Sequence, residues 1–192
     1  FKEFLQDRRA ARCTEKTIEH YEYTCGGFIE WLEREKEAHR VEHVTARHIR
    51  DFLVSLQNRD LEDTTQHAHA RGIKAWFNWL VGEGVLDQSP MANVSMPKLE
   101  KRTLPPFERE QIRALLSQFD TETEIGARNH AIVLALLDTG LRASEFLSLQ
   151  IADMDRGSGD IVVMGKGQQQ RTVCMGDKTR GAIHHMLSYR QT

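Results

Sequence analysis

An arginine and a glutamate three residues apart, Arg142 and Glu145, follow a helix-breaking glycine in the segment Thr139-Gly-Leu-Arg-Ala-Ser-Glu145. The spacing predicts that both lie on one face of a short helix, with the arginine at its start. A guanidinium beside the free N–H groups of a helix start is a good receptor for a phosphate group. The alternative is a surface ion pair worth about 0.2–0.5 kcal/mol. Spacing alone leaves both interpretations open.

A lysine between two glycines, Lys166, marks a second place where chemistry is possible. β-rich runs at 160–164 and 171–175 flank the polar segment 165–170, which predicts a β-hairpin with a glycine-rich tip. The segment lacks the G-x-x-x-x-G-K-[ST] pattern of a nucleotide-binding P-loop and lies between strands. Taken alone, an ordinary charged turn is the simplest interpretation of this segment.

The cysteines and histidines do not form a recognisable metal site. The three cysteines are scattered and form no C-x-x-C pair, which argues against a zinc ribbon or a disulfide framework and fits a reducing cytoplasm. Nine histidines include a His67-x-His69 spacing and the pair His184-His185. Residues one or two apart on a helix point away from each other, so neither arrangement predicts a ligand set.

Composition predicts a globular protein without a strong overall charge. About 40% of the 192 residues are hydrophobic and 28% are charged, and the formal charge is −2. Binding to nucleic acid would therefore depend on local basic faces and not on overall attraction. The longest apolar run, 131–137, is too short to span a bilayer, so no membrane association is expected.

Residues 1–88 are predicted to form a unit of four helices. Apolar side chains recur at steps of three and four residues, as on an amphipathic helix, for example at Ile18, Tyr21, Cys25, Phe28 and Leu32. The helices are expected to begin near Phe1, after a Thr14 cap, after Thr45 and after a Thr64 cap. Segment 89–106 holds all four prolines of the chain and is predicted to be a linker.

Residues 107–192 are predicted to form a second domain that positions Arg142 and Lys166. The helix expected over 127–138 is apolar on most sides, so we predict that it is buried in the core. Gly140 should end it. The other helices are expected at 108–119, 141–149 and 178–189, with the hairpin before the last of them.

In this order and context, these features resemble the tyrosine recombinase family, also known as the phage integrase or Xer-type family. The segment 128–153 is similar to that family's first catalytic block, and the Gly-Lys-Gly hairpin is similar to its catalytic-lysine hairpin. The segments 14–21 and 75–90 resemble its core-binding domain. The resemblance implies a mainly α fold with a small β-hairpin. A four-helix SAM-like core-binding domain is followed by the first part of an α+β catalytic domain.

The resemblance also implies a mechanism for site-specific recombination and integration of DNA. Such enzymes attack a DNA phosphodiester with a tyrosine, form a 3′-phosphotyrosyl link and free a 5′-hydroxyl, without a nucleotide cofactor or a metal. By position, Arg142 would hold the scissile phosphate and stabilise its developing charge. Lys166 would be the general acid for the leaving oxygen. Glu145 would orient the other site residues without contacting the phosphate itself.

The sequence departs from the family pattern after the hairpin. The family requires a His-x-x-Arg, a further His or Trp and the tyrosine nucleophile, whereas this chain ends at Thr192. Tyr189 comes too early and is expected to pack on an ordinary helix. We therefore expect a C-terminally incomplete recombinase that binds DNA but lacks its nucleophile. If the natural protein ends near Thr192, the alternative is a DNA-binding module that never cuts. A third alternative is a helical protein-interaction domain.

The resemblance suggests that the predicted second and fourth helices and the linker contact double-stranded DNA. The expected contacts are Lys16, His20, Thr65, His67, Arg71, Lys74, Lys98, Lys101 and Arg102. Gln66 and His69 lie on the same predicted fourth helix. The alternative for any one of them is a solvated helix face. The family also implies self-association on DNA as a synaptic tetramer, and a cytoplasmic location.

Overall fold

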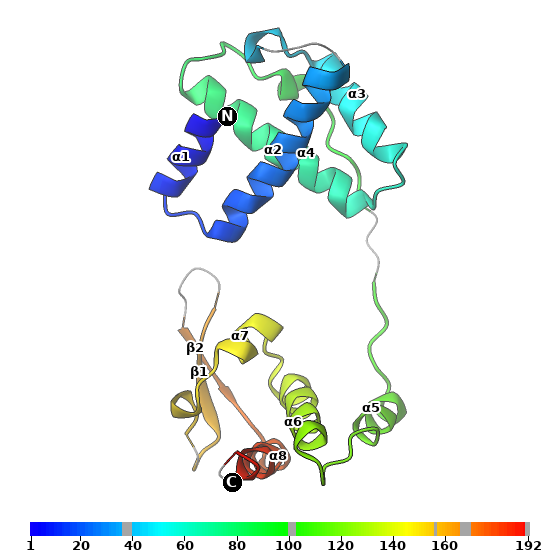
Figure 1. Cartoon of the computed structure of the whole chain (residues 1–192), viewed down its shortest axis with the longest axis vertical. Coiled ribbons are helices and arrows are strands. Elements are labelled where there is room, and N and C mark those ends of the chain that lie inside the picture. Colours follow the sequence, from blue (N-terminus) through cyan, green and yellow to red (C-terminus); the bar gives the residue numbers. More distant parts are fainter. Residues whose placement is uncertain (36–39, 100–102, 156, 166–169, 191–192) are drawn as a thin grey trace. The chain divides into compact units, whose positions relative to one another are not determined.

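The computed structural model describes residues 1–35, 40–99, 103–155, 157–165 and 170–190 (Figure 1). The chain forms two compact units, residues 1–103 and residues 104–192. We call them the helical unit and the mixed unit and describe each by itself. No helix in the described ranges has the length and apolar character that crossing a bilayer requires.

The helical unit is built from the helices α1 Lys2–Ala10, α2 Glu15–Glu35, α3 Ala46–Gln57 and α4 Asp63–Gly82, with short 3-10 turns η1 Val41–His43 and η2 Pro90–Asn93. Thr45 caps α3, since its hydroxyl accepts the His48 N–H. The expected Thr64 cap is wrong, because α4 already begins at Asp63 after Glu62. The acidic side chain of Asp63 suits this first turn.

Phenylalanine rings fill the core of the helical unit. Phe4, Phe28, Phe52 and Phe77 are at most 2% exposed. Helices α2 and α4 cross closely at Gly72, where a Cβ atom would lie 2.1 Å from the Thr24 hydroxyl oxygen. The side chain of a larger residue would not fit at this crossing.

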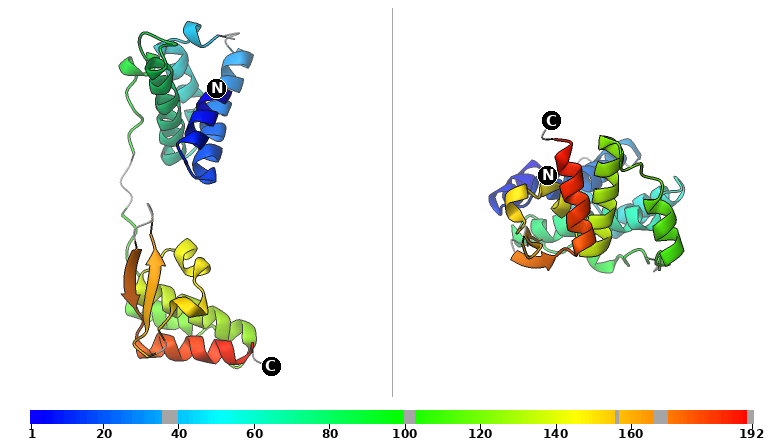
Figure 2. Two further views of the ribbon diagram at one scale, coloured as in Figure 1. Left: turned by 90° about the vertical axis from the view of Figure 1, so that its left-hand side faces the viewer. Right: turned by 90° about the horizontal axis from the view of Figure 1, so that it is seen from below.

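The mixed unit contains the helices α5 Arg109–Leu116, α6 Glu124–Thr139, α7 Ala143–Ser148 and α8 Asp177–Ser188, the 3-10 turn η3 Ile151–Asp153, and the strands β1 Asp160–Met164 and β2 Gln170–Cys174 (Figure 2). The strands pair antiparallel, with Val163 opposite Arg171 and Ile161 opposite Val173. Helices α6 and α8 lie side by side. Gly140 ends α6 with a φ of 61°, a left-handed conformation that suits glycine.

Helix α6 is less buried than its sequence predicts. Its buried residues are small, namely Gly126, Ala127, Ala131 and Ala135. Leu137, by contrast, is 43% exposed. The expectation of a helix buried on most sides is therefore wrong, because the described neighbours of α6, mainly α8, fully bury its small residues and leave side chains such as Ile125 and Leu137 exposed.

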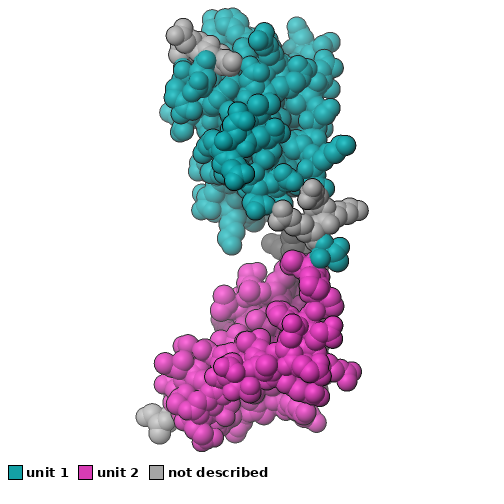
Figure 3. All heavy atoms as spheres, turned by 90° about the vertical axis from the view of Figure 1, so that its right-hand side faces the viewer, with its two compact units in different colours: residues 1–103 teal, residues 104–192 magenta. Residues whose placement is uncertain are grey.

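The boundary between the units at residues 103 and 104 falls inside the segment predicted as a linker (Figure 3). The first part of that segment belongs to the helical unit. Met91, in η2, is only 3% exposed and packs in the helical core. The serine before the turn, Ser89, caps it by accepting the Met91 N–H.

Candidate active site

The turn between α6 and α7 places Arg142 and Glu145 against each other. Arg142 stands at the N-terminal boundary of α7, and Glu145 lies in its first turn. The Glu145 carboxylate accepts the backbone N–H of Arg142 at Oε2 (2.9 Å) and the Arg142 Nη1 at Oε1 (2.9 Å). Because this carboxylate binds both the backbone and the side chain of Arg142, it restrains the orientation of the guanidinium.

A second arginine, Arg171 of β2, completes the cluster. Its Nη1 donates to Glu145 Oε1 at 2.9 Å and its Nη2 donates to Glu145 Oε2 at 2.8 Å. Glu145 is 7% exposed. The Arg171 guanidinium, followed by the backbone N–H of Arg142, lowers the pKa of Glu145 to about 2, and Glu145 in turn raises the pKa of Arg171. The carboxylate is therefore charged at every pH near neutrality.

Sequence reasoning missed Arg171, although its strand carried a signal. Side chains alternate between the two faces of a strand, so Arg171 shares a face with Val173. Its partner across the hairpin, Val163, is 3% exposed. An arginine on the inner face of a sheet needs a carboxylate partner, because an unpaired buried charge is costly. Which carboxylate pairs with it could not be read from the sequence, since Glu145 lies 26 residues away.

The guanidinium of Arg142 points mostly into solvent. Its side chain is 68% exposed, whereas that of Arg171 is 38% exposed. Among the described residues, its side-chain hydrogen bonding is to Glu145 alone. A guanidinium carries five N–H donors in a planar fork, so most of them are available to an anion. The site can present a fixed, positively charged fork to a phosphate group.

The predicted DNA contacts of the helical unit fall into exposed and half-buried groups. Lys16, Arg71, Lys74 and Lys98 are exposed, and His20, Thr65 and His67 are half-buried. Lys101 and Arg102 lie outside the described residues, so the structure places neither of them.

Two of the half-buried residues, both histidines, have defined surroundings. Burial, followed by the positive charge of Arg71, lowers the pKa of His20. Both effects disfavour the charged form of His20 in the absence of DNA. The ring Nδ1 of His67 lies 3.0 Å from the Pro97 carbonyl oxygen, which ties α4 to the segment that carries Lys98.

Gln66 and His69 of α4 do not face solvent. Gln66 is 7% exposed and donates from Nε2 to the Leu61 carbonyl oxygen at 2.8 Å. His69 is 4% exposed, and its Nδ1 lies 3.1 Å from the Thr24 carbonyl oxygen. The buried face of α4, which packs against α2, thus includes these two polar side chains.

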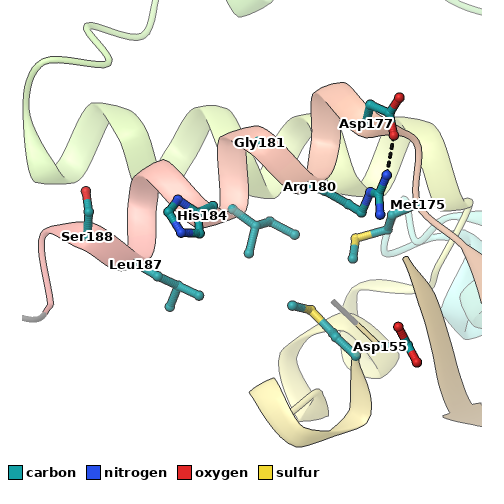
Figure 4. A pocket seen from close by; sticks show the side chains of 10 residues that line it. Asp155, Met175, Asp177, Arg180, Gly181, His184, Leu187 and Ser188 are labelled. Carbon is teal, nitrogen blue, oxygen red and sulfur yellow. Dashed lines mark hydrogen bonds and ion pairs between the residues drawn. The ribbon is translucent and has the colours of Figure 1, made fainter. Parts of the chain in front are cut away.

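A pocket of about 410 Å³ lies beside α8, apart from the predicted site residues (Figure 4). Met154, Met175, Ile183 and Leu187 provide its apolar lining. Near the end of α8, the Tyr189 hydroxyl donates to the Thr121 carbonyl oxygen at 3.3 Å. Tyr189 thus links α8 to the segment before α6.

The two units match two parts of one protein family. Residues 1–86 match the phage integrase N-terminal SAM-like domain, and residues 106–192 match the phage integrase family. The chain belongs to the phage integrase family of tyrosine recombinases. The resemblance drawn from the Arg142 segment and the hairpin is thereby confirmed, as is the mainly α fold with a small hairpin.

Relatives from the tyrosine recombinase family align with this chain over nearly its whole length. The tyrosine recombinase XerC of Anoxybacillus flavithermus is 28% identical over 187 residues, which are 97% of this chain and 61% of that protein. The tyrosine recombinase XerD of Oceanobacillus iheyensis is 23% identical, over 98% of this chain and 62% of that protein. The chain thus spans about three fifths of the length of these relatives.

Solved structures of recombinases share the fold. The Tn1549 transposon integrase in complex with a circular intermediate DNA matches with a TM-score of 0.74 and 16% identity, over 95% of this chain and 62% of that chain. The XerH site-specific recombinase bound to a palindromic difH substrate matches with a TM-score of 0.68 and 18% identity, over 96% of this chain and 56% of that chain. At these identities the likeness extends to the fold alone.

The lysine expected from the family resemblance, Lys166, lies outside the described residues. The strands on either side of it are described, and β2 carries Arg171 directly after its first residue, Gln170. Through Arg171 and Glu145, the strand that leaves the Lys166 segment is bonded to α7. The described strands β1 and β2 are therefore tied to the turn of Arg142.

Proposed function

We propose that the protein containing this chain is a site-specific recombinase that cleaves and rejoins DNA through a phosphotyrosyl intermediate. The observation that carries this proposal is the exposed guanidinium of Arg142, held from behind by the buried, charged Glu145. Relatives named tyrosine recombinases and solved integrases bound to DNA support it.

In the proposed reaction, a tyrosine oxygen attacks the phosphorus of a phosphodiester, and the bond from phosphorus to the 5′-oxygen breaks. Arg142 donates hydrogen bonds to the non-bridging oxygens and stabilises the charge that grows on them. Lys166 gives its proton to the leaving 5′-oxygen. Rejoining reverses these steps when a 5′-hydroxyl from a partner duplex attacks the phosphotyrosyl link.

The helical unit supplies the sequence-independent grip on DNA in this proposal. Lys16, Arg71, Lys74 and Lys98 present exposed cations to backbone phosphates, and Lys101 and Arg102 are proposed to do the same. Thr65, His67 and His20 are proposed as further contacts to DNA.

The partners in this proposal are double-stranded DNA and further copies of the same protein, assembled as a tetramer at synapsis. Two recombining duplexes each present two cleavage positions, so four copies of the site are needed. We place the protein in the cytoplasm. Its cysteines, Cys13, Cys25 and Cys174, are free thiols, as a reducing compartment would keep them.

The test of this function is trapping of a covalent adduct on nicked duplex DNA. The DNA site is first selected from a random duplex library with the complete gene product. We expect an adduct with the complete product, on a tyrosine outside residues 1–192, and binding without an adduct for residues 1–192 alone. Site-specific binding without any adduct would favour a DNA-binding module that never cuts, and an adduct on Tyr189 would contradict our assignment of that residue.

The role of Lys166 predicts a rescue by sulfur. General acids contribute roughly a hundred- to ten-thousand-fold, so Lys166→Ala should cleave normal DNA very slowly. A substrate with sulfur in place of the bridging 5′-oxygen should be cleaved at nearly the wild-type rate, because a thiolate leaves without a proton. Arg142→Ala is the matched control and should stay slow on both substrates. Equal impairment of Lys166→Ala on both substrates would make Lys166 a binding residue.

A further inference from the structure

The two oxygens of Glu145 are fully used by their neighbours. Among the described residues, Oε1 accepts from Arg142 Nη1 and Arg171 Nη1, and Oε2 accepts from the Arg142 backbone N–H and Arg171 Nη2. A carboxylate has about four lone-pair positions. Arg171 fills two of them with the paired geometry in which a guanidinium binds a carboxylate most strongly.

This geometry divides the charge of the cluster unequally. One carboxylate faces two guanidinium groups, so the cluster has a net charge of +1. Arg171 makes the bidentate pair with Glu145, whereas Arg142 makes a single side-chain hydrogen bond and remains 68% exposed. The uncompensated positive charge therefore lies on Arg142, which is the side chain that we propose binds the phosphate.

We propose that Arg171 is a positioning residue that keeps Arg142 available to the scissile phosphate by occupying Glu145. This inference rests on the function proposed for Arg142. Without Arg171, two lone-pair positions of a nearly buried carboxylate would face one arginine only. Arg142 would then turn its fork onto Glu145 and form the bidentate pair itself, and the guanidinium would have to leave that pair to stabilise the charge that develops on the phosphate during cleavage.

Two other roles for Arg171 make different predictions. An ion pair that only stabilises the mixed unit would change the unfolding midpoint and leave the cleavage rate of the folded protein unchanged. A direct contact of Arg171 with DNA would lower affinity together with rate, and the loss would not depend on Glu145. If Arg171 is a positioning residue, its loss lowers the cleavage rate and leaves the DNA affinity unchanged. This effect requires that residue 145 carries a charge.

The test compares single-turnover cleavage rates and DNA affinities of the complete gene product, on the selected site, well below each variant's unfolding midpoint. Arg171→Gln should slow cleavage by up to about 100-fold, because a misplacement of a catalytic group by about 1 Å can cost that much, and Kd should stay within about twofold. Arg171→Lys keeps the charge but not the paired hydrogen bonds, and should lie between Arg171→Gln and wild type.

A double-mutant cycle with Glu145→Gln decides the mechanism. A glutamine has no charge to trap Arg142, so adding Arg171→Gln to Glu145→Gln should cost less than about threefold, which means strong coupling between the two sites. An equal loss on both backgrounds, or a parallel loss of affinity, would overturn the inference. If Arg171→Gln does not fold, Arg171→Lys decides instead, and a wild-type rate for that variant would overturn it.

Arg142→Ala in the same assay separates this inference from the proposed function. If Arg142→Ala cleaves at the wild-type rate, the function proposed for Arg142 fails. If Arg142→Ala is slow and Arg171→Gln is not, the function stands and the positioning role of Arg171 alone is wrong.

Discussion

The two units bury an ionisable side chain in opposite ways. In the helical unit, His69 is 4% exposed, has a backbone carbonyl as its hydrogen-bond partner, and has a pKa lowered mainly by burial. In the mixed unit, Glu145 is 7% exposed, is held by two arginines, and has a pKa lowered to about 2 mainly by Arg171. Burial disfavours the charged form of His69, whereas hydrogen bonding favours the charged form of Glu145.

The apolar packing of the two units also differs. Aromatic rings fill the helical unit, and its helices α2 and α4 approach closely at Gly72. In the mixed unit the buried face of α6 is made of small residues, and larger apolar side chains such as Leu137 remain exposed. A buried ion pair is weak evidence for stability, but a strongly perturbed group is often functional. Among the described residues, the helical unit thus has an aromatic core, whereas the mixed unit holds a cluster of paired charges at Glu145.

The largest stability effect is expected where the helical unit is packed most tightly. A Cβ atom in Gly72→Ala would lie 2.1 Å from the Thr24 hydroxyl oxygen, so the Thr24 side chain or the helix that carries it must shift. Overpacking of this kind costs about 1–3 kcal/mol. All three tryptophans, Trp31, Trp76 and Trp79, lie in the helical unit, so tryptophan fluorescence during urea unfolding measures this unit alone.

Gly82→Ala, at the end of the same helix, is the matched control. No atom lies within 4 Å of its added Cβ, so the urea midpoint should stay the same or rise. If Gly72→Ala unfolds at the same urea concentration as Gly82→Ala, the close crossing does not determine the stability of this unit.

A smaller effect, confined to the mixed unit, is expected for Asp138→Ala. The Asp138 carboxylate, in α6, accepts the Gly176 N–H at 2.8 Å and the Thr179 hydroxyl at 2.7 Å, and so caps α8 from a neighbouring helix. Its loss should cost about 1 kcal/mol, measured as faster hydrogen exchange of the α8 amides. Asp138→Asn keeps an acceptor oxygen and should lose less. A shift of the tryptophan-detected midpoint would show that the two units do not respond separately.

The smallest effect is a difference in pH dependence between the units. A lowered histidine pKa means that the unfolded chain binds the proton more readily, so His69 makes the helical unit less stable as pH falls below about 6.5. His20 acts in the same direction. The contribution of Glu145 to stability is complete above about pH 4.5 and is lost only as pH falls toward 2.

Between pH 7 and 5, His69→Gln should flatten the decline of the tryptophan-detected unfolding midpoint with falling pH, whereas Glu145→Gln should leave the slope of that decline unchanged. Identical slopes for His69→Gln and wild type would contradict a lowered pKa.

Local patterns made much of this fold predictable. The three- and four-residue spacing of apolar side chains predicted the helices, and Gly140 predicted the end of α6. The spacing of Arg142 and Glu145 predicted that they share a face. Long-range pairing could not be predicted in this way. The pairing of Arg171 with Glu145 and the burial of His69 against α2 both depend on contacts between distant segments. Periodicity within one element does not encode such contacts.

The central claim, that Arg142 stabilises charge developing on a scissile phosphate, is tested most directly by comparing rate with affinity. Arg142→Ala in the complete gene product should slow single-turnover cleavage of the selected DNA site by about a hundred- to a thousand-fold. Its Kd for the same site should change only a few-fold, because the guanidinium acts more strongly on the transition state than on the bound substrate. A loss of affinity as large as the loss of rate, or an unchanged rate, would contradict the claim.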